Sequence, residues 1–295
     1  MLRRLLPAAL GLLPALSFAG SFQLTAQNDS GFSTDRAYTS GVRLSHLWES
    51  RVADAPRWEL GILQQIFTPD TSRDPAALDE RPYAARLLLY GARHAAGPGR
   101  LDTLEVSAGV TGPSALGRQA QDLFHRFVSS PEPDWRRQLH DRFDGNAGAT
   151  FTRTLARSAS HPVSLAGHAG GSVGTVLGYV HGGLEARWGA EQAPWSEALR
   201  LAASPVTDAG RGGGLSAFAG ASVRQVFRSE LLERNGDDPG RRLDREDTVV
   251  RYAAGAGYAA AWGTVTFALA QESREYASQP YRHRFWSLGL AIALD

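Results

Sequence analysis

TVVRYAAGAGYAAAW, residues 248–262, alternates between two kinds of side chain along its whole length. One face carries the large apolar groups Val250, Tyr252, Tyr258 and Trp262, and the other carries Arg251 with small residues. Residues 180–188 and 286–294 repeat this period of two. Strands of about ten residues with one apolar face and one small or polar face are typical of transmembrane β-barrels.

About twelve segments of this kind can be counted along the chain. They lie near residues 21–29, 38–48, 58–67, 83–94, 101–110, 146–156, 163–176, 179–189, 212–228, 248–261, 263–273 and 284–294. We therefore expect an all-β fold, a transmembrane antiparallel barrel of about 12 strands, because closing a sheet satisfies every backbone group in hydrocarbon. The alternative is a soluble β-sandwich or barrel with its faces inverted. The terminal Asp295 favours that alternative, since outer-membrane barrels commonly end in an aromatic residue.

Composition narrows the class of protein. The 295 residues include 31 basic and 30 acidic side chains, so a nucleic-acid binder with a strong positive field is not expected. There is no Cys, which excludes disulfides, thiol nucleophiles and Cys-ligated metal sites.

Residues 1–19 resemble a secretory signal peptide, with two arginines, a short apolar stretch and Ser17-Phe18-Ala19 for cleavage. A buried N-terminal helix is the alternative for this segment. We expect a barrel domain over 20–295, exported to a Gram-negative periplasm or outer membrane.

One connection has helical rather than strand periodicity. Gly112-Pro113-Ser114 predicts a helix start with Ser114 as its N-cap. An apolar stripe then follows at helical spacing: Leu116, Ala120, Leu123, Phe124 and Phe127. A helix between two barrel strands is unusual and points to a function.

Polar residues on this helix suggest chemistry. Gln121 and His125 are four residues apart, so they lie on one helix face, and a histidine beside an amide could act as a general base. Asp122 could orient the ring. The alternative is a surface histidine on an exposed loop helix, with a solvated Asp122.

The first two strands carry a second polar group. Asn28 and Asp29 end the first strand, and parity places Asp29 with Gln27, and Thr39 with Arg43, on the non-apolar face. A hairpin would bring Asp29 and Thr39 together, and such oxygen donors could bind Ca²⁺. Ordinary turn chemistry explains the same residues equally well.

Several motifs occur in a fixed order: Asn28-Asp29, Thr34–Gly41, Thr68-Pro69, Asp79–Ala84, Gly112-Pro113-Ser114, Gln121-x-x-x-His125, Trp135 and Gln138-Leu139. In this order and spacing the first half of the chain resembles the LpxR-type lipid A 3′-O-deacylase family. The second half matches only as alternating strands.

This resemblance implies an outer-membrane enzyme with its active site between the barrel wall and the helix. It implies that His125 activates water, that a calcium site and oxyanion stabilisation draw on Asn28 and Asp29, and that Thr39 and Gln121 belong to the active site. The implied substrate is lipid A of lipopolysaccharide in outer-membrane lipid, with no nucleic acid and no obligate protein partner. Candidates for its phosphates are Arg36, Arg43, Arg73 and Arg81, each of which could equally be an ordinary lumenal or loop charge.

The chain departs from the family pattern at two positions. The family's loop Lys has no counterpart, and Arg73 is the nearest basic residue. Ala85 stands where the family usually has Gly.

Two other functions remain open. One is a Ser-dependent outer-membrane phospholipase, although neighbours Ser45 and His46 would point to opposite faces of a strand. The other is a non-enzymatic barrel, a pore or an adhesin.

Overall fold

The computed structural model describes residues 20–32, 36–48, 55–70, 79–128, 133–189, 213–232 and 243–294. Within them the chain forms twelve antiparallel strands that close into a barrel, each paired with its sequence neighbours and β1 with β12. The strands are β1 (Gly20–Asn28), β2 (Ala37–Trp48), β3 (Arg57–Thr68), β4 (Ala84–Gly97), β5 (Arg100–Thr111), β6 (Arg142–Arg157), β7 (Val163–Gly174), β8 (Leu177–Gly189), β9 (Gly214–Ser229), β10 (Thr248–Ala260), β11 (Gly263–Glu272) and β12 (His283–Leu294). The predicted barrel is confirmed, and the signal peptide predicted over 1–19 lies outside the described residues.

The period of two separates an apolar outer face from a polar lumen. Val180 and Tyr252, from the two alternating stretches, are more than half exposed on the outside. Their neighbours His181 and Arg251 are buried inside. An apolar outer face and a polar interior are the arrangement that a lipid bilayer requires of a barrel.

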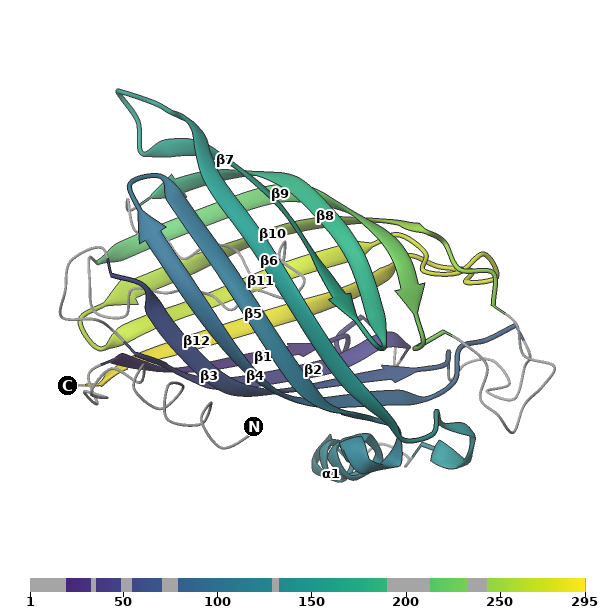
Figure 1. Cartoon of the computed structure of the whole chain (residues 1–295). Coiled ribbons are helices and arrows are strands. Elements are labelled where there is room, and N and C mark those ends of the chain that lie inside the picture. The colour runs from purple at the N-terminus through teal and green to yellow at the C-terminus, as the bar shows by residue number, and fades with distance from the viewer. Residues whose placement is uncertain are drawn as a thin grey trace, which may run out of the picture.

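The two ends of the barrel differ. Gly20 pairs with Leu294, so the first and last strands meet at one end, which we call the terminal end. The connections β1–β2, β3–β4, β5–β6, β9–β10 and β11–β12 lie at the opposite end, the loop end (Figure 1). Even strand number places both termini on one side, the periplasmic side in outer-membrane barrels, so the loop end faces outward.

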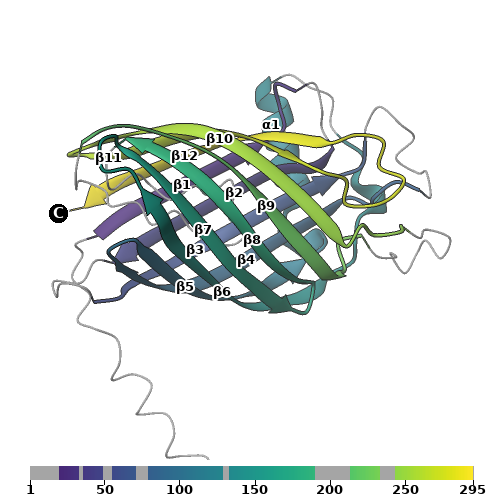
Figure 2. The ribbon, with the colours of Figure 1, turned by 90° about the horizontal axis from the view of Figure 1, so that it is seen from above.

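The helix predicted after Gly112-Pro113-Ser114 is present. It is α1 (Gly117–Val128), preceded by a 3₁₀ turn at Pro113–Ala115 and followed by another at Trp135–Arg137. Seen from two directions, α1 lies outside the barrel near the loop end and does not enter the lumen (Figures 1 and 2). Within the described residues, none of the helices is long and apolar enough to cross a membrane.

The start of this helical segment differs from the prediction in one detail. Ser114 is not the N-cap, since it lies inside the 3₁₀ turn. Its backbone N–H and its hydroxyl both donate to the carboxylate of Asp141, at 2.8 and 2.7 Å. These two hydrogen bonds lower the pKa of Asp141 and tie the turn to the start of β6.

Gly112 allows the chain to leave the wall here. It has φ of +86°, and a Cβ at this position would lie 2.5 Å from the backbone N of Asp141. Glycine is therefore required at this turn by both conformation and space.

Candidate functional site

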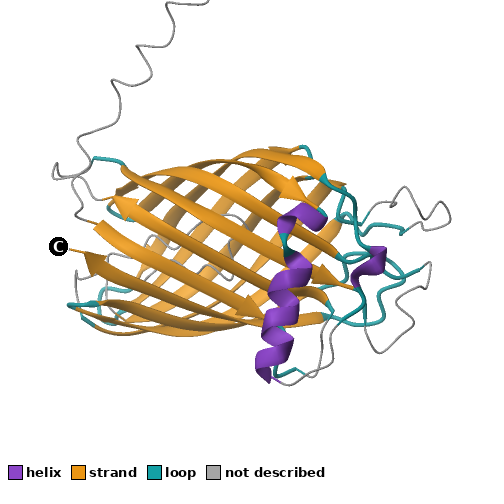
Figure 3. Ribbon diagram, turned by 90° about the horizontal axis from the view of Figure 1, so that it is seen from below, coloured by secondary structure: helices purple, strands orange, loops and turns teal. Residues whose placement is uncertain are grey.

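The helix α1 packs on the outer surface of β3 and β4. It rests on an apolar cluster of nearly fully buried residues, Ile66, Tyr83, Ala85, Ala115 and Trp135, against which Ala120 of α1 packs. The helix crosses the strands near their loop ends rather than running along them (Figure 3). This cluster fixes the height and direction of α1 on the wall.

The closest approach between helix and wall is made by Gly117. A Cβ on this residue would lie 2.4 Å from the methyl group of Ala85 and 2.7 Å from the Trp135 ring. The Ala85 methyl group, a departure from the family pattern, thus fills the contact that Gly117 leaves open. The departure therefore bears on packing between the helix and the wall.

Trp135 also fixes the amide of Gln121. Its indole Nε1–H donates a hydrogen bond of 2.9 Å to Oε1 of Gln121. An indole N–H is only a donor, so the atom that faces it must be the amide oxygen. The Gln121 NH₂ group is consequently directed away from Trp135, and Gln121 acts toward the rest of the site as a donor.

His125 lies one turn further along α1 and is buried, 8 % exposed. Asp122 is also buried, and its Oδ2 lies 3.5 Å from Nε of Arg118 in an i, i+4 ion pair. Within the described chain its Oδ1 has no hydrogen-bond partner. Asp122 therefore pairs with Arg118, and its role in orienting the His125 ring, considered from the sequence, stays a prediction.

The second polar group sits where β1 and β2 meet. The backbone N–H of Asp29 donates to the carbonyl of Thr39 at 3.1 Å, so the predicted approach of Asp29 and Thr39 is confirmed. The carboxylate of Asp29 accepts a hydrogen bond from the backbone N–H of Arg36 at 2.9 Å, and the Asn28 side chain accepts one from Ser30 at 2.6 Å. All three predicted residues are nearly fully buried.

The face of Thr39 was predicted wrongly. A register irregularity between Tyr38 and Ser40 interrupts the parity of β2. Tyr38 points into the lumen, where its hydroxyl donates to Gln27 at 2.7 Å. Thr39 therefore leaves the lumenal face of Arg43 and forms a 2.5 Å hydrogen bond with the hydroxyl of Thr68 on β3.

Thr68 connects the two polar groups. Phe67, its neighbour, lies in the lumenal cluster, so alternation turns Thr68 outward. Ile66, two residues earlier on the same strand, lies under α1 in the cluster with Trp135. The structure therefore places Asn28, Asp29 and Thr39 at the same end of the barrel as Gln121 and His125, with Thr39 bonded to Thr68 on β3, one of the two strands under α1. We call these five residues the wall site.

The four candidate arginines are not brought to the wall site together. Arg36 lies beside Asp29 at the loop end, where it pairs with Asp70 at 3.1 Å and covers the ring of Tyr281. Arg81 is buried at the lumen mouth and pairs with Glu275 at 2.8 Å. Arg43 lies inside the lumen, which was the alternative considered from sequence. Arg73 lies outside the described residues.

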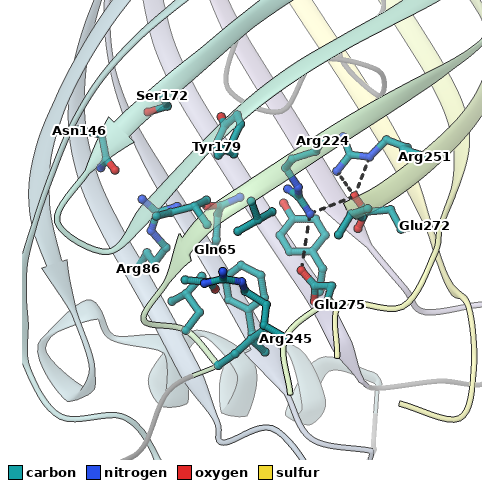
Figure 4. Close-up of a pocket in the computed structure, with 18 of the residues that line it drawn as sticks. Gln65, Arg86, Asn146, Ser172, Tyr179, Arg224, Arg245, Arg251, Glu272 and Glu275 are labelled. Atoms are coloured by element: carbon teal, nitrogen blue, oxygen red, sulfur yellow. Dashed lines mark hydrogen bonds and ion pairs between the residues drawn. The ribbon is translucent and has the colours of Figure 1, made fainter. Parts of the chain in front are cut away.

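The lumen holds a separate charged cavity of about 1070 Å³, open solvent included. Arg251 donates to Glu272 at 2.6 Å, and Arg224 lies within 3.7 Å of Glu272 and 3.6 Å of Glu275 (Figure 4). Arg86 is nearby and donates to Asp144 at 2.7 Å. Each of these arginines thus lies within ion-pair distance of a carboxylate in the lumen.

Deeper in the lumen a second set of side chains, which we call the lumenal network, fills the barrel. Glu59 accepts hydrogen bonds from Tyr90 at 2.5 Å and lies 2.9 Å from Nε2 of His94. Arg43 donates to Glu105 at 2.7 Å and stacks over the Tyr90 ring. Ser45 also points inward and is buried, whereas His46 packs against Trp48, so the predicted separation of Ser45 and His46 is confirmed.

The donor groups of the wall site bear on whether it could hold a cation. Within the described residues, no three or more His, Asp or Glu side chains gather as metal ligands. The side-chain donors at the loop ends of β1, β2 and β3 are oxygens: the Asp29 carboxylate, the Asn28 amide and the hydroxyls of Thr39 and Thr68. Calcium also accepts amide, hydroxyl, backbone carbonyl and water oxygens, so this donor chemistry fits Ca²⁺ rather than a softer metal.

Two residues of this site were not assigned a role from sequence. Trp135 and Thr68 both stand in the ordered motifs, but nothing in the sequence pairs Trp135 with Gln121 or Thr68 with Thr39. The available signal was the presence of a hydrogen-bonding side chain within each motif. Their partners come from distant positions in the chain and depend on the fold.

The family described as "Outer membrane protein LpxR" matches residues 5–294. Among curated proteins, no sequence matches the chain significantly.

Among solved structures, LpxR from Salmonella typhimurium matches with a TM-score of 0.76 and 20 % identity, covering 93 % of this chain and 100 % of that one. The COG4313 outer membrane channel from Pseudomonas putida F1 has a TM-score of 0.48 and 11 % identity, covering 96 % and 98 %. The β domain of the Bordetella autotransporter Brka also has a TM-score of 0.48, with 14 % identity over 94 % and 100 %.

Proposed function

The chain belongs to the LpxR family of Gram-negative outer-membrane proteins, and we propose that it is a lipid A deacylase that hydrolyses the ester of the 3′-linked acyloxyacyl group. The observation that carries this proposal is the position of Gln121 and His125, which α1 holds against the lipid-facing side of the wall. A polar site on this face meets lipids rather than solutes in the lumen.

His125 is the proposed general base. Its imidazole takes a proton from water, whose oxygen attacks the ester carbonyl carbon and forms a tetrahedral intermediate. The bond from carbon to the sugar oxygen then breaks, and the proton passes from the imidazolium to that oxygen. The products are a free fatty acid and a 3′-hydroxyl group. General-base assistance of this kind typically contributes about 10²–10⁴-fold.

Donors near the carbonyl would stabilise the negative charge of the intermediate. Trp135 holds the oxygen of Gln121, which leaves the Gln121 NH₂ group to face the reaction. Asn28 is the second donor in this proposal, because its Oδ1 already accepts from Ser30 and its NH₂ group is turned the other way. Fixed donors contribute strongly in a dry site because they need no reorganisation.

Calcium is the proposed cofactor, held by the carboxylate of Asp29 with Thr39 nearby. When bound, the ion would supply positive charge to the oxyanion. Chelation with EDTA should then abolish hydrolysis and added Ca²⁺ should restore it, measured as fatty acid released from lipid A in detergent. Full activity in EDTA would remove Asp29 from this role.

Two arginines are proposed for the substrate phosphates. Arg36 is partly exposed beside Asp29, and Arg73 belongs to the same loop region as the family's Lys. A guanidinium binds phosphate oxygens in pairs, but it is always charged and cannot replace a titrating Lys. Arg43 and Arg81 are left out because the lumen and its mouth hold them in ion pairs.

The test is mass spectrometry of lipid A from a Gram-negative host that expresses the chain or its His125→Ala variant. We expect loss of the 3′-acyloxyacyl group with the parent and none with the variant, while both show heat-modifiable gel mobility. Unchanged lipid A with the parent, also in detergent with Ca²⁺, would overturn the proposal. Ion conductance or ligand binding in that case would indicate a pore or an adhesin.

A further inference from the structure

The side chains of α1 are distributed in the opposite way to those of a helix on a soluble protein. The face toward the wall carries the buried polar residues Gln121 and His125. The large apolar residues point away, with exposed fractions of 69 % for Leu123 and 41 % for Phe124 on α1 and 47 % for Leu116, which directly precedes the helix. In water, this arrangement would expose the very groups that folding normally buries.

The charged residues of α1 occupy a different edge from the apolar ones. Arg118 is exposed and pairs with Asp122, and Arg126 is exposed as well. At about 100° per residue, Arg118 and Leu123 lie about 140° apart around the helix. The helix thus has three faces: polar toward the wall, apolar along one edge, and charged along another.

The wall beside α1 carries an apolar surface that continues this edge. The outward residues of β3 and β4 beyond the helix include Leu60, Ile62 and Leu89, each about half exposed. That band is the lipid-facing surface of an outer-membrane barrel, and α1 packs on the same two strands. The exposed leucines of α1 therefore lie next to a surface whose solvent is hydrocarbon.

The direction of α1 agrees with such an environment. It crosses the strands near the loop end, so its axis lies across the barrel axis and in the plane of the membrane (Figure 3). Twelve residues give a helix about 18 Å long, well short of a bilayer. Helices that lie in the interface have this combination of an apolar face, arginines on another face and an in-plane axis.

We infer that α1 is an interfacial helix that inserts Leu123 and Phe124, together with Leu116 directly before it, among the acyl chains of the outer leaflet, with Arg118 and Arg126 at the level of the headgroups. The occupant of its apolar edge is lipid hydrocarbon. This inference rests on the outer-membrane barrel and not on the proposed reaction. It places Gln121 and His125 at the boundary between headgroups and chains, where the ester bonds of a glycolipid lie.

The absence of Cys makes the depth of α1 directly measurable. Leu123→Cys and Arg118→Cys, each labelled with a nitroxide in proteoliposomes, can be compared by electron paramagnetic resonance. Oxygen concentrates in hydrocarbon, whereas a nickel chelate stays in water. We expect the Leu123 label to collide mainly with oxygen and the Arg118 label mainly with nickel.

Two further labels calibrate the scale. Ile62→Cys on β3 provides the lipid reference, and Ser160→Cys in the exposed turn between β6 and β7 provides the water reference. A Leu123 label as open to nickel as the Ser160 label would overturn the inference. Dipolar broadening between Leu123 labels would also overturn it, because a second copy of the chain would then cover the edge. Phe124→Cys repeats the measurement if Leu123→Cys does not fold.

Discussion

The wall site and the lumenal network lie on opposite sides of one sheet, and they differ in how their polar side chains are stabilised. In the lumen, Glu59, His94 and Arg43 are matched with partners of opposite charge or complementary hydrogen bonding. On the outer wall, Gln121 and His125 are polar residues on the side where the barrel meets hydrocarbon. A polar group on that side is destabilising unless something covers it, and α1 provides the cover.

The difference indicates which region carries stability and which carries chemistry. Charges of the lumenal network are neutralised within the protein, so their removal should change folding. Gln121 and His125 of the wall site are positioned by a helix that the barrel itself does not need for closure. Their removal should change the reaction and leave the barrel intact.

The sharpest test of this comparison is His125→Ala. We expect turnover to fall by about 10²–10⁴-fold because the general base is lost. The heat-modifiable gel mobility should stay unchanged because the contacts between α1 and the wall are retained. Fatty acid release from lipid A measures the effect. His161→Ala, in an exposed turn at the terminal end, is the matched control and should keep full activity. Equal activity in both variants would contradict the role of His125.

The opposite outcome is expected for Glu59→Gln in the lumen. The carboxylate holds Tyr90 and His94, and loss of its charge leaves a buried network unbalanced, at a stability loss of up to about 3–5 kcal/mol. The temperature at which the folded gel band disappears should decrease. Activity per folded molecule should stay the same, and a specific loss of activity would show that the two regions are coupled.

A smaller effect is expected for Trp135→Phe. The ring packing against Tyr83 is retained, but the hydrogen bond to Gln121 is lost, worth about 0.5–1.5 kcal/mol. This corresponds to a decrease of about 2- to 12-fold in kcat, with KM unchanged. In a Gln121→Ala background, Trp135→Phe should have no further effect on kcat. The same decrease in both backgrounds would mean that Trp135 acts through packing and not through the amide.

The smallest effect is expected for Arg153→Gln. Arg153 pairs with Asp102 between β5 and β6, and both side chains are partly exposed. Such pairs contribute about 0–1 kcal/mol, so neither the unfolding temperature nor the activity should change appreciably. A stability loss as large as that of Glu59→Gln would show that the difference in burial between the Glu59 contacts and the Arg153–Asp102 pair does not determine how much each contributes to stability.

Much of the wall site was accessible from the sequence, but its geometry was not. The spacing of Gln121 and His125 predicts a shared helix face, and both are buried on α1. Strict alternation along β2 predicted the wrong face for Thr39, because a bulge after Tyr38 shifts the strand by one position. The local sequence gives no sign of this bulge. Ser114 was assigned as the N-cap from its position, but Asp141, far along the chain, binds it instead.

The sequence by itself determined the barrel, its twelve strands and the side that faces lipid, because period-two alternation is a local property that backbone geometry converts directly into two faces. It also located the helix. Only the tertiary structure decided that Arg43 belongs to the lumen, that Thr39 meets Thr68, and that Trp135 turns the amide of Gln121. These contacts join residues far apart in sequence, and they form only when the closed sheet fixes which strands, and which faces of them, are neighbours.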